Sequence, residues 1–241
     1  MPRIEVCLAP QLYDITADNS TVVVVVDILR ATSAICTAIE HGAKKIIPVC
    51  TVEEAKKYLD GDYLVAAERN GEIVDGFEHG NSPYSFMGKQ VKGSTIVLTT
   101  TNGTLAINKA SNAFKVLIGS FINLTALTKW LAKDDHNIVF LCAGWKGRFN
   151  LEDSLFAGAV INLLAEYRDF DIMEDSALAA RYLYEKAKDD PGKFLSHSSH
   201  RRRLARLDLK KDIKYCLTPD QSNTIPYLNN GIIVEMDNSL V

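Results

Sequence analysis

The stretch that decides the fold is VVVVVDILRATS, residues 22–33. It opens with five consecutive valines, a short β-branched apolar run that is typical of a strand buried on both faces of a parallel sheet. Asp27 ends this run, and residues 31–40 follow with apolar side chains at helical spacing. A strand, a polar turn and a helix in this order place Asp27 and Arg30 at the carboxyl edge of a sheet, where open α/β folds bind ligands.

The same alternation of strand and helix continues through about residue 165, which predicts an α/β fold with a mainly parallel sheet flanked by helices. Further strands are expected at residues 4–8, 45–50, 63–67, 94–100, 115–119, 137–142, 213–217 and 232–235. Helices are expected at residues 31–40, at 52–59 behind a capping box of Thr51 and Glu54, briefly at 83–87, up to about 110, and at 124–132, 155–167, 174–188 and within 197–212. We predict one domain over residues 1–241; two lobes of about 1–135 and 136–241, with the active site in the cleft between them, are the alternative division.

Composition narrows the class of protein. The 241 residues carry a formal net charge of −3 and the pI is near 6.0, which argues against a nucleic-acid binder. No apolar run reaches the roughly 20 residues that cross a bilayer, and Glu5 interrupts the first apolar stretch, so we expect neither a membrane span nor a signal peptide. Five widely spaced cysteines without a CxxC pair fit a reducing cytoplasm. A homodimer is the default expectation for a soluble enzyme of this size.

Four of the predicted strands end in clusters of polar or glycine residues. These clusters are DILRATS, ERNG, TTNGT and CAGWKGR, at residues 27–33, 68–71, 100–104 and 142–148. Because the carboxyl ends of parallel strands lie along one edge of a sheet, the four clusters should converge on one cleft. The sequence therefore predicts a functional site there.

Two features of these clusters suit an anionic ligand. Residues 100–104 combine hydroxyls, a glycine and the start of a helix, which is an arrangement that binds anions. A capped turn with Asn-Gly in the left-handed conformation is an equal alternative. Arg30 and Arg69 are suited to hold an oxyanion through two hydrogen bonds each, with structural pairing to Asp27 and Glu68 as the alternative.

Carboxylates at the same edge suit a metal ion. Asp27, Glu68, Glu152 and Asp153 supply enough of them for Mg²⁺, which usually takes one or two carboxylates together with water and substrate oxygens. Residues 152 and 153 also suit the first turn of a helix without any metal. Arginines, an anion cradle and spare carboxylates together predict a small phosphorylated acid as the ligand.

Three further features are weaker candidates. His79 lies in the glycine-rich loop of residues 68–83, where it is a candidate general acid or a surface residue. Cys142 is a candidate nucleophile, although a buried core cysteine is the simpler interpretation. The basic run at residues 201–203 is most simply a solvated helix face.

The motifs together resemble a known family. VVVVVDILRATSAICTAIEHGA, ERNG followed by GFEHGNSP, TTTNGT and CAGWKGRFNLED are similar in order and spacing to the signatures of the 2-phosphosulfolactate phosphatase family. The tail HRRRLARLDLKKDIKYCLTPDQSNTIPYL fits as well, so the resemblance covers nearly the whole chain.

The resemblance implies an Mg²⁺-dependent phosphatase that converts 2-phospho-3-sulfolactate to 3-sulfolactate and phosphate, a step of coenzyme M biosynthesis. It also implies an α/β fold distinct from that of the haloacid dehalogenase phosphatases, whose Asp-x-Asp nucleophile motif is absent because Leu29 stands two residues after Asp27. A phosphatase of another small phosphorylated carboxylic acid, and a non-catalytic phospho-acid binding module, are the alternative functions.

The family's shared positions map onto named residues of this chain. They are Asp27, Arg30, Glu68, Arg69, Asn70, Asn81, Ser82, Thr101, Asn102, Gly103, Glu152 and Asp153. We assign Asp27 and Arg30 to catalysis and Asp27, Glu68 and Asp153 to the metal, with Asp27 as either a ligand or a covalent nucleophile. The residues expected to bind the phosphorylated and sulfonated substrate are Arg69, Asn70, Asn81, Ser82, Thr101, Asn102, Gly103 and Gly144.

Overall fold

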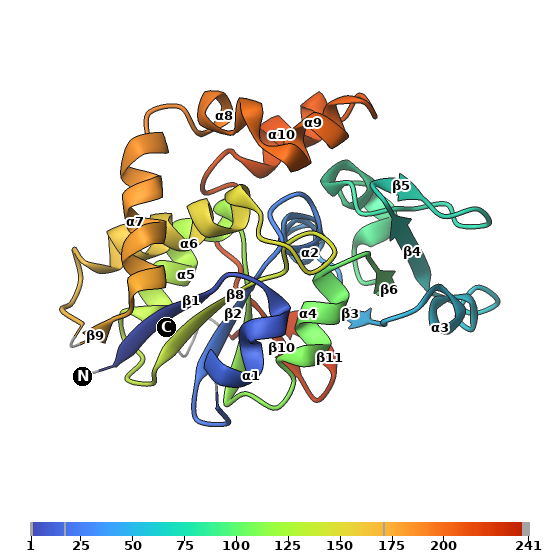
Figure 1. Cartoon of the computed structure of the whole chain (residues 1–241). Helices are drawn as coiled ribbons and strands as arrows, with labels where there is room; N and C mark the ends of the chain where they lie inside the picture. Colours follow the sequence, from blue (N-terminus) through green and yellow to red (C-terminus); the bar gives the residue numbers. More distant parts are fainter. Residues whose placement is uncertain (1, 17, 171, 238–241) are drawn as a thin grey trace.

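The computed structural model describes residues 2–16, 18–170 and 172–237 and has an α/β architecture, with helices on both faces of one sheet (Figure 1). The strands are β1 Arg3–Cys7, β2 Val22–Val26, β3 Lys45–Pro48, β4 Leu64–Arg69, β5 Glu72–Ile73, β6 Thr95–Thr99, β7 Lys115–Gly119, β8 Ile138–Cys142, β9 Ile172–Met173, β10 Pro226–Asn229 and β11 Ile232–Glu235. The α-helices are α1 Tyr13–Thr16, α2 Ala31–Glu40, α3 Val52–Lys56, α4 Gly103–Lys109, α5 Leu124–Leu131, α6 Leu151–Leu164, α7 Asp175–Ala187, α8 Pro191–Phe194, α9 Ser199–Ala205 and α10 Lys210–Cys216. Short 3-10 helices are η1 Pro10–Leu12, η2 Pro83–Phe86, η3 Lys89–Val91, η4 Phe121–Asn123 and η5 Leu195–His197.

The sheet is mainly parallel, which confirms the predicted fold class. Across the described residues its strand order is β5-β4-β6-β3-β11-β10-β7-β2-β8-β1-β9. Strands β4, β6 and β3 are parallel to one another, and so are β7, β2, β8, β1 and β9. The antiparallel hairpin of β10 and β11 lies between these two groups.

Strand β2 lies between two hydrophobic cores, as its run of valines predicts. All five valines are fully buried. Val22, Val24 and Val26 pack with residues of α5, α6 and α7, whereas Val23 and Val25 pack with residues of α2 and α4. Because successive side chains of a strand point to opposite faces, a run without any polar residue is what a strand covered by helices on both sides requires.

Local helix signals are also confirmed. The Thr51 Oγ1 accepts a hydrogen bond from the Glu54 N–H at 3.1 Å, and the Glu54 carboxylate accepts one from the Thr51 N–H at 3.1 Å. This reciprocal pair is the capping box that starts α3. At the start of α6, the side chain of Asn150 accepts from the Asp153 N–H at 3.3 Å.

Two predictions near the carboxyl end of the chain are wrong. Residues 213–217 were expected to form a strand, but α10 runs through Cys216. Its buried residues Ile213 and Cys216 are three positions apart, which places them on one face of a helix. The sequence interpretation also missed β10, which pairs with β11 through a turn in which Asn230 and Gly231 both have positive φ.

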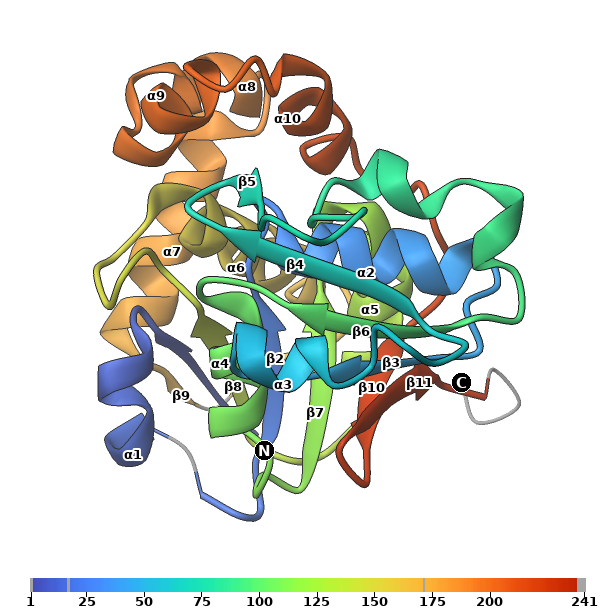
Figure 2. The same ribbon diagram turned by 90° about the vertical axis from the view of Figure 1, so that its right-hand side faces the viewer.

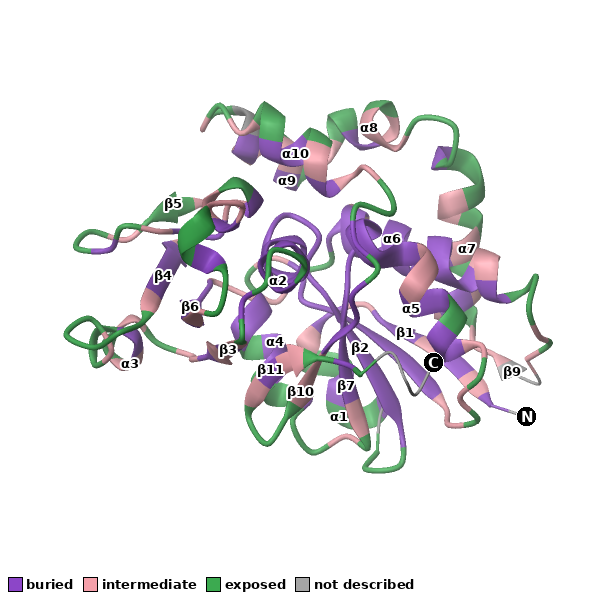
Figure 3. Ribbon diagram, turned by 180° about the vertical axis from the view of Figure 1, so that it is seen from behind, coloured by how far each residue is buried: buried purple, intermediate pink, exposed green. Residues whose placement is uncertain are grey.

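Residues 191–216, which contain α8, η5, α9 and α10, form a helical segment that we call the cap. The cap lies across the top of Figure 1, over α2 and α6, and Figure 2 shows it above β5 as well. Figure 3 shows that the central strands are buried whereas the cap is a mixture of buried and exposed residues. Within the described part of the chain, no helix combines the length and apolar character that crossing a bilayer requires.

Candidate active site

The structure brings the four strand-end motifs together. The Arg30 Nη2 group, which follows β2, donates to the Gly71 carbonyl, which follows β4, at 2.7 Å. The Thr101 N–H, which follows β6, donates to the Glu68 carboxylate at the end of β4 at 3.0 Å. The Lys146 N–H, which follows β8, donates to Asn102 Oδ1 at 3.0 Å. The predicted convergence is therefore a direct network of hydrogen bonds.

Asp27 occupies the centre of this edge and is only 6% exposed. Its own N–H donates to Thr32 Oγ1 at 3.1 Å, which ties the turn to the first residues of α2. Gly103, the first residue of α4, packs closely against it: a Cβ at this position would meet the Ala31 side chain and would lie 2.8 Å from Asp27 Oδ2. Glycine is therefore required for α4 to approach this carboxylate.

Glu68 is buried and held by a shell of donors. Its carboxylate accepts from the Gly71 N–H at 2.5 Å, from the Thr101 N–H at 3.0 Å and from the Thr101 hydroxyl at 3.0 and 3.2 Å. The Asn81 amide donates to it at 3.5 Å. These contacts fix the carboxylate in one position at the edge of the sheet.

Asp153 is fully buried beside Asp27. Its two oxygens accept from the Ile28 N–H at 2.9 Å and the Gly144 N–H at 3.2 Å. Burial raises the pKa of Asp153, and the neighbouring Glu152 adds to this. Burial, together with the charges of Asp153 and Glu68, also raises the pKa of Asp27 well above its usual value. We call Asp27, Glu68 and Asp153 the floor; its negative charges repel one another, and a cation would relieve this repulsion.

A narrow cavity of about 20 Å³ lies over Asp27 and Glu68. It is lined by Asp27, Leu29, Arg30, Glu68, Asn70, Gly71, Asn81, Asn102, Trp145, His200, Arg203 and Leu204. Six of the predicted site residues are among them: Asp27, Arg30, Glu68, Asn70, Asn81 and Asn102. Asn81 Oδ1 is buried without a hydrogen-bond partner among the described residues, so it is available to accept from water or from a ligand.

The cap supplies three lining residues, His200, Arg203 and Leu204, none of which the sequence interpretation assigned to the site. His200 Nδ1 contacts Glu152 Oε1, so α9 is joined to the first turn of α6. The Arg203 guanidinium lies 3.8 Å from the centroid of the Trp145 ring, and the Trp145 and His200 rings are 5.5 Å apart. The prediction that residues 201–203 form a solvated face is therefore wrong for Arg203, whose Nη2 is buried.

Arg30 and Arg69 are bound differently from what was expected. Arg30 does not pair with Asp27; its Nη1 forms a 2.5 Å ion pair with Asp212 of the cap and its Nη2 donates to the Gly71 carbonyl at 2.7 Å. Arg69 donates to the carbonyls of Glu68 and Cys50 and to Thr99 Oγ1. Arg69 does not line the cavity, and its assignment to substrate binding stays a prediction.

The other predicted residues support the lining. Thr101, Gly103, Gly144 and Asp153 lie behind it, where they bind Glu68, pack on Asp27 or brace one another. Ser82 lines a neighbouring hollow that shares Arg30, Gly71 and Asn81 with the cavity. Most of the predicted substrate-binding positions thus lie in or immediately around one site.

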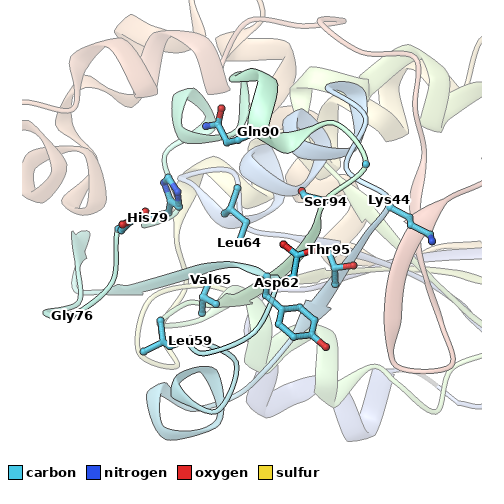
Figure 4. A pocket seen from close by; sticks show the side chains of 13 residues that line it. Lys44, Leu59, Asp62, Leu64, Val65, Gly76, His79, Gln90, Ser94 and Thr95 are labelled. Atoms are coloured by element: carbon cyan, nitrogen blue, oxygen red, sulfur yellow. The ribbon is translucent and has the colours of Figure 1, made fainter.

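His79 and Cys142 lie elsewhere. His79 lines a separate hollow of about 610 Å³ at the other end of β4 and β6, shown in Figure 4 together with Lys44, Leu64 and Thr95. Cys142 is fully buried in the core, and burial raises the pKa of its thiol well above the usual value. A buried neutral thiol is a core residue, as the simpler interpretation predicted.

The floor fits the oxygen chemistry of Mg²⁺. Within the described ranges, no group of three or more His, Cys, Asp or Glu side chains is gathered so as to hold a metal ion, so the three floor carboxylates do not form an all-protein cage. Mg²⁺ does not need such a cage, because one or two carboxylates suffice when waters and substrate oxygens complete the octahedron. Glu68 and Asp153 accept several hydrogen bonds from the protein, which leaves Asp27 as the floor carboxylate best placed to face a ligand.

These features define an α/β protein whose active-site cavity has an acidic floor and a basic cap. The sequence model of the family described as 2-phosphosulpholactate phosphatase matches residues 7–231, so the chain belongs to this family. This confirms the resemblance seen in the motifs.

Curated relatives agree with the family. A probable 2-phosphosulfolactate phosphatase of Caldanaerobacter subterraneus subsp. tengcongensis is 41% identical over 215 residues, which cover 88% of this chain and 89% of the relative. That of Thermotoga petrophila is 42% identical over 211 residues, with 88% and 90% covered. That of Clostridium perfringens is 35% identical over 244 residues, with 99% and 98% covered.

Proposed function

We propose that this chain hydrolyses the phosphate ester of 2-phospho-3-sulfolactate to give 3-sulfolactate and inorganic phosphate. The family match and the names of the relatives support this substrate. The observation that carries the chemistry is the position of Asp27, a nearly buried carboxylate at the base of a cavity whose cap bears His200 and Arg203. An acidic base and a cationic rim suit a ligand that carries several negative charges together with a metal ion.

We further propose that the enzyme depends on Mg²⁺, held by Asp27 with Asp153 or Glu68. When bound, the ion would neutralise charge on the phosphoryl oxygens and activate a water molecule. Asp27 would orient the groups bound at the floor, and Gly103 allows the start of α4 to approach this carboxylate closely. Asn70, Asn81 and Asn102 are the amide side chains that line the cavity.

Positioning and exclusion of water fall to the remaining residues. Arg30 is tied to Asp212 and Gly71, so in this site it connects the start of α2 to the cap. Because these partners already engage its guanidinium, Arg30 would stabilise the anionic transition state through its buried positive charge rather than through hydrogen bonds to the substrate. The cap encloses the reacting groups, which strengthens each of these charge interactions.

Phosphate release tests the proposal. The purified protein is incubated with 2-phospho-3-sulfolactate, 2-phospholactate and phosphoglycolate, each with Mg²⁺ and with EDTA. We expect the fastest release from the sulfonated ester, loss of release in EDTA and recovery on adding Mg²⁺. Faster release from another ester would replace the substrate and keep the chemistry, whereas undiminished release in EDTA would contradict an essential, removable ion.

The cellular setting is also a proposal. A step of the coenzyme M biosynthesis type, carried out in the cytoplasm, follows from the substrate we propose and from the unpaired cysteines. Accumulation of 2-phospho-3-sulfolactate in cells that lack this chain would support it, and unchanged levels would contradict it.

A further inference from the structure

Arg203 has an unusual environment for an arginine of a short surface helix. Its guanidinium stacks on the Trp145 ring at 3.8 Å, and its Nη2 is buried with no hydrogen-bond partner in the described part of the chain. A buried donor of this kind is normally paired, because leaving it unpaired costs free energy. The side chain therefore points to an acceptor that the protein itself does not provide.

The neighbouring arginines of α9 do not share this property. Arg201 Nη1 donates to the Gly192 carbonyl, and Arg202 Nη1 donates to the His197 carbonyl. Both are therefore used to hold the cap together. Arg203 alone of the three lines the cavity.

The surroundings hold Arg203 in place. The Trp145 and Arg148 backbones exchange hydrogen bonds at 2.8 and 3.0 Å, which closes a tight turn after β8. Gly144 starts this turn with φ +62, and a Cβ there would collide with the Arg148 carbonyl. On the other side, Leu204 is 3% exposed and packs in the core, so α9 cannot rotate freely. The guanidinium of Arg203 is thus held in a fixed position against the Trp145 ring.

Glu152 is the acidic residue that could pair with Arg203. Its Oε2 is also buried without a hydrogen bond among the described residues. Yet the ion pair of Glu152 is formed with His200, and none joins it to Arg203. Glu152 acts on Arg203 electrostatically without a hydrogen bond between them, so Arg203 Nη2 keeps a donor that no described group accepts.

We propose that Arg203, backed by Trp145, binds the sulfonate group of the substrate. This rests on the proposed function and identifies the residue that selects a sulfonated ester. The floor, with its metal, receives the phosphoryl group, and the sulfonate sulfur lies one bond further from the ester carbon than the carboxylate carbon does. The sulfonate, as the acid group further from the ester, is the one that this proposal places at the cap. Its delocalised, weakly hydrated charge suits a guanidinium stacked on an indole better than a strongly hydrated ammonium.

The test compares two esters that differ only in this group. kcat/KM is measured for 2-phospho-3-sulfolactate and for 2-phospholactate, in which a methyl replaces the sulfomethyl group. Arg203→Ala is expected to lower kcat/KM about 100-fold for the sulfonated ester and less than about threefold for 2-phospholactate. Arg203→Lys should recover only part of the loss. Arg206→Ala, which removes an exposed arginine at the end of α9, should leave both values unchanged.

Equal losses on the two esters in Arg203→Ala would overturn the inference and leave the phosphatase function standing. Arg203 would then have a structural role, such as pairing with Glu152, and the thermal midpoint of the variant would fall as well. Should Arg203→Ala fail to fold, Arg203→Met, whose uncharged side chain is as long as the arginine stem, takes its place.

A binding measurement separates this inference from the proposed function. Calorimetry records the affinity of wild type and Arg203→Ala for 3-sulfolactate and for lactate. A loss confined to 3-sulfolactate supports the inference even if wild type releases no phosphate from either ester, an outcome that would refute the proposed function alone. Equal affinities of wild type and variant for 3-sulfolactate would overturn the inference.

Discussion

The floor and the cap meet in one cavity, but they are built in opposite ways. The floor carboxylates lie at strand ends and in the first turn of α6, and backbone N–H groups of neighbouring motifs hold Glu68 and Asp153. The cap side chains stand on α9, a helix of seven residues. Among the described residues, two buried ion pairs join the cap to the elements that carry the floor: Arg30 with Asp212 and Glu152 with His200. Under our proposals, the chemistry depends on carboxylates held by the sheet, whereas substrate selection depends on a short helix that is attached by few contacts.

The largest effect is expected at the floor. Asp27→Asn should reduce kcat by at least about 1,000-fold, because the carboxylate that faces the ligand loses its charge without a change of shape. Circular dichroism and the thermal midpoint should stay close to wild type. The exposed Asp14→Asn is the matched control and should keep full activity. Activity of Asp27→Asn within a few-fold of wild type would remove Asp27 from catalysis.

The ion pair that joins the cap to the start of α2 should have the largest effect on the free energy of unfolding. Asp212→Ala leaves the Arg30 guanidinium buried without its 2.5 Å partner, which should cost on the order of 3 kcal/mol of the free energy of unfolding. Urea unfolding measures this. The exposed pair of Asp14 and Lys109 provides the control, since Asp14→Ala should change the midpoint little. A loss no greater than that of the control would show that the cap does not depend on this ion pair.

The approach of α4 to Asp27 gives a smaller, geometric effect. Gly103→Ala adds a methyl group where the Ala31 side chain and Asp27 Oδ2 already lie, so α4 must shift. A displaced site should lower kcat about tenfold with little change in the fold. Gly192→Ala in the cap is the control, because its nearest neighbour would be 3.4 Å away. Equal kcat values for the two variants would mean that the close packing of α4 is unimportant for turnover.

The smallest expected effect concerns local unfolding of the cap compared with the sheet. Cys216 of the cap and Cys142 below the floor are both fully buried, and burial raises the pKa of Cys216 to about 12. In a Cys50→Ser background, a thiol reagent at low urea concentration should modify Cys216 several-fold faster than Cys142, because thinner layers open first. Mass spectrometry of digested samples measures both rates. Identical rates would show that the cap and the sheet open as one unit.

The fold and the floor were predictable from sequence to different degrees. Strand β2, helix α2 and the capping box of α3 follow from local patterns, and the structure has them where predicted. The convergence of four motifs followed from one topological rule and is confirmed by hydrogen bonds between them. The strand predicted at residues 213–217 failed because a short apolar run does not distinguish a strand from one face of a helix.

The basic cap was less predictable. Arg201, Arg202 and Arg203 are identical in type and adjacent, yet only Arg203 lines the cavity. A run of three arginines carries no periodicity that separates them, so the signal had to come from the orientation of α9. The tail that begins at His200 contributes to the family resemblance, but the resemblance alone assigns no role to His200 or Arg203.

The sequence by itself determined the buried central strand, the helices that begin at its polar end and the family to which the chain belongs, because hydrophobic burial, capping and turn chemistry act between residues that are close along the chain. Only the tertiary structure decided that Arg30 pairs with Asp212, 182 positions away, and that Glu152 pairs with His200, 48 positions away. Such pairs depend on which surfaces pack together and on how far water is excluded from them. That information belongs to the folded chain as a whole.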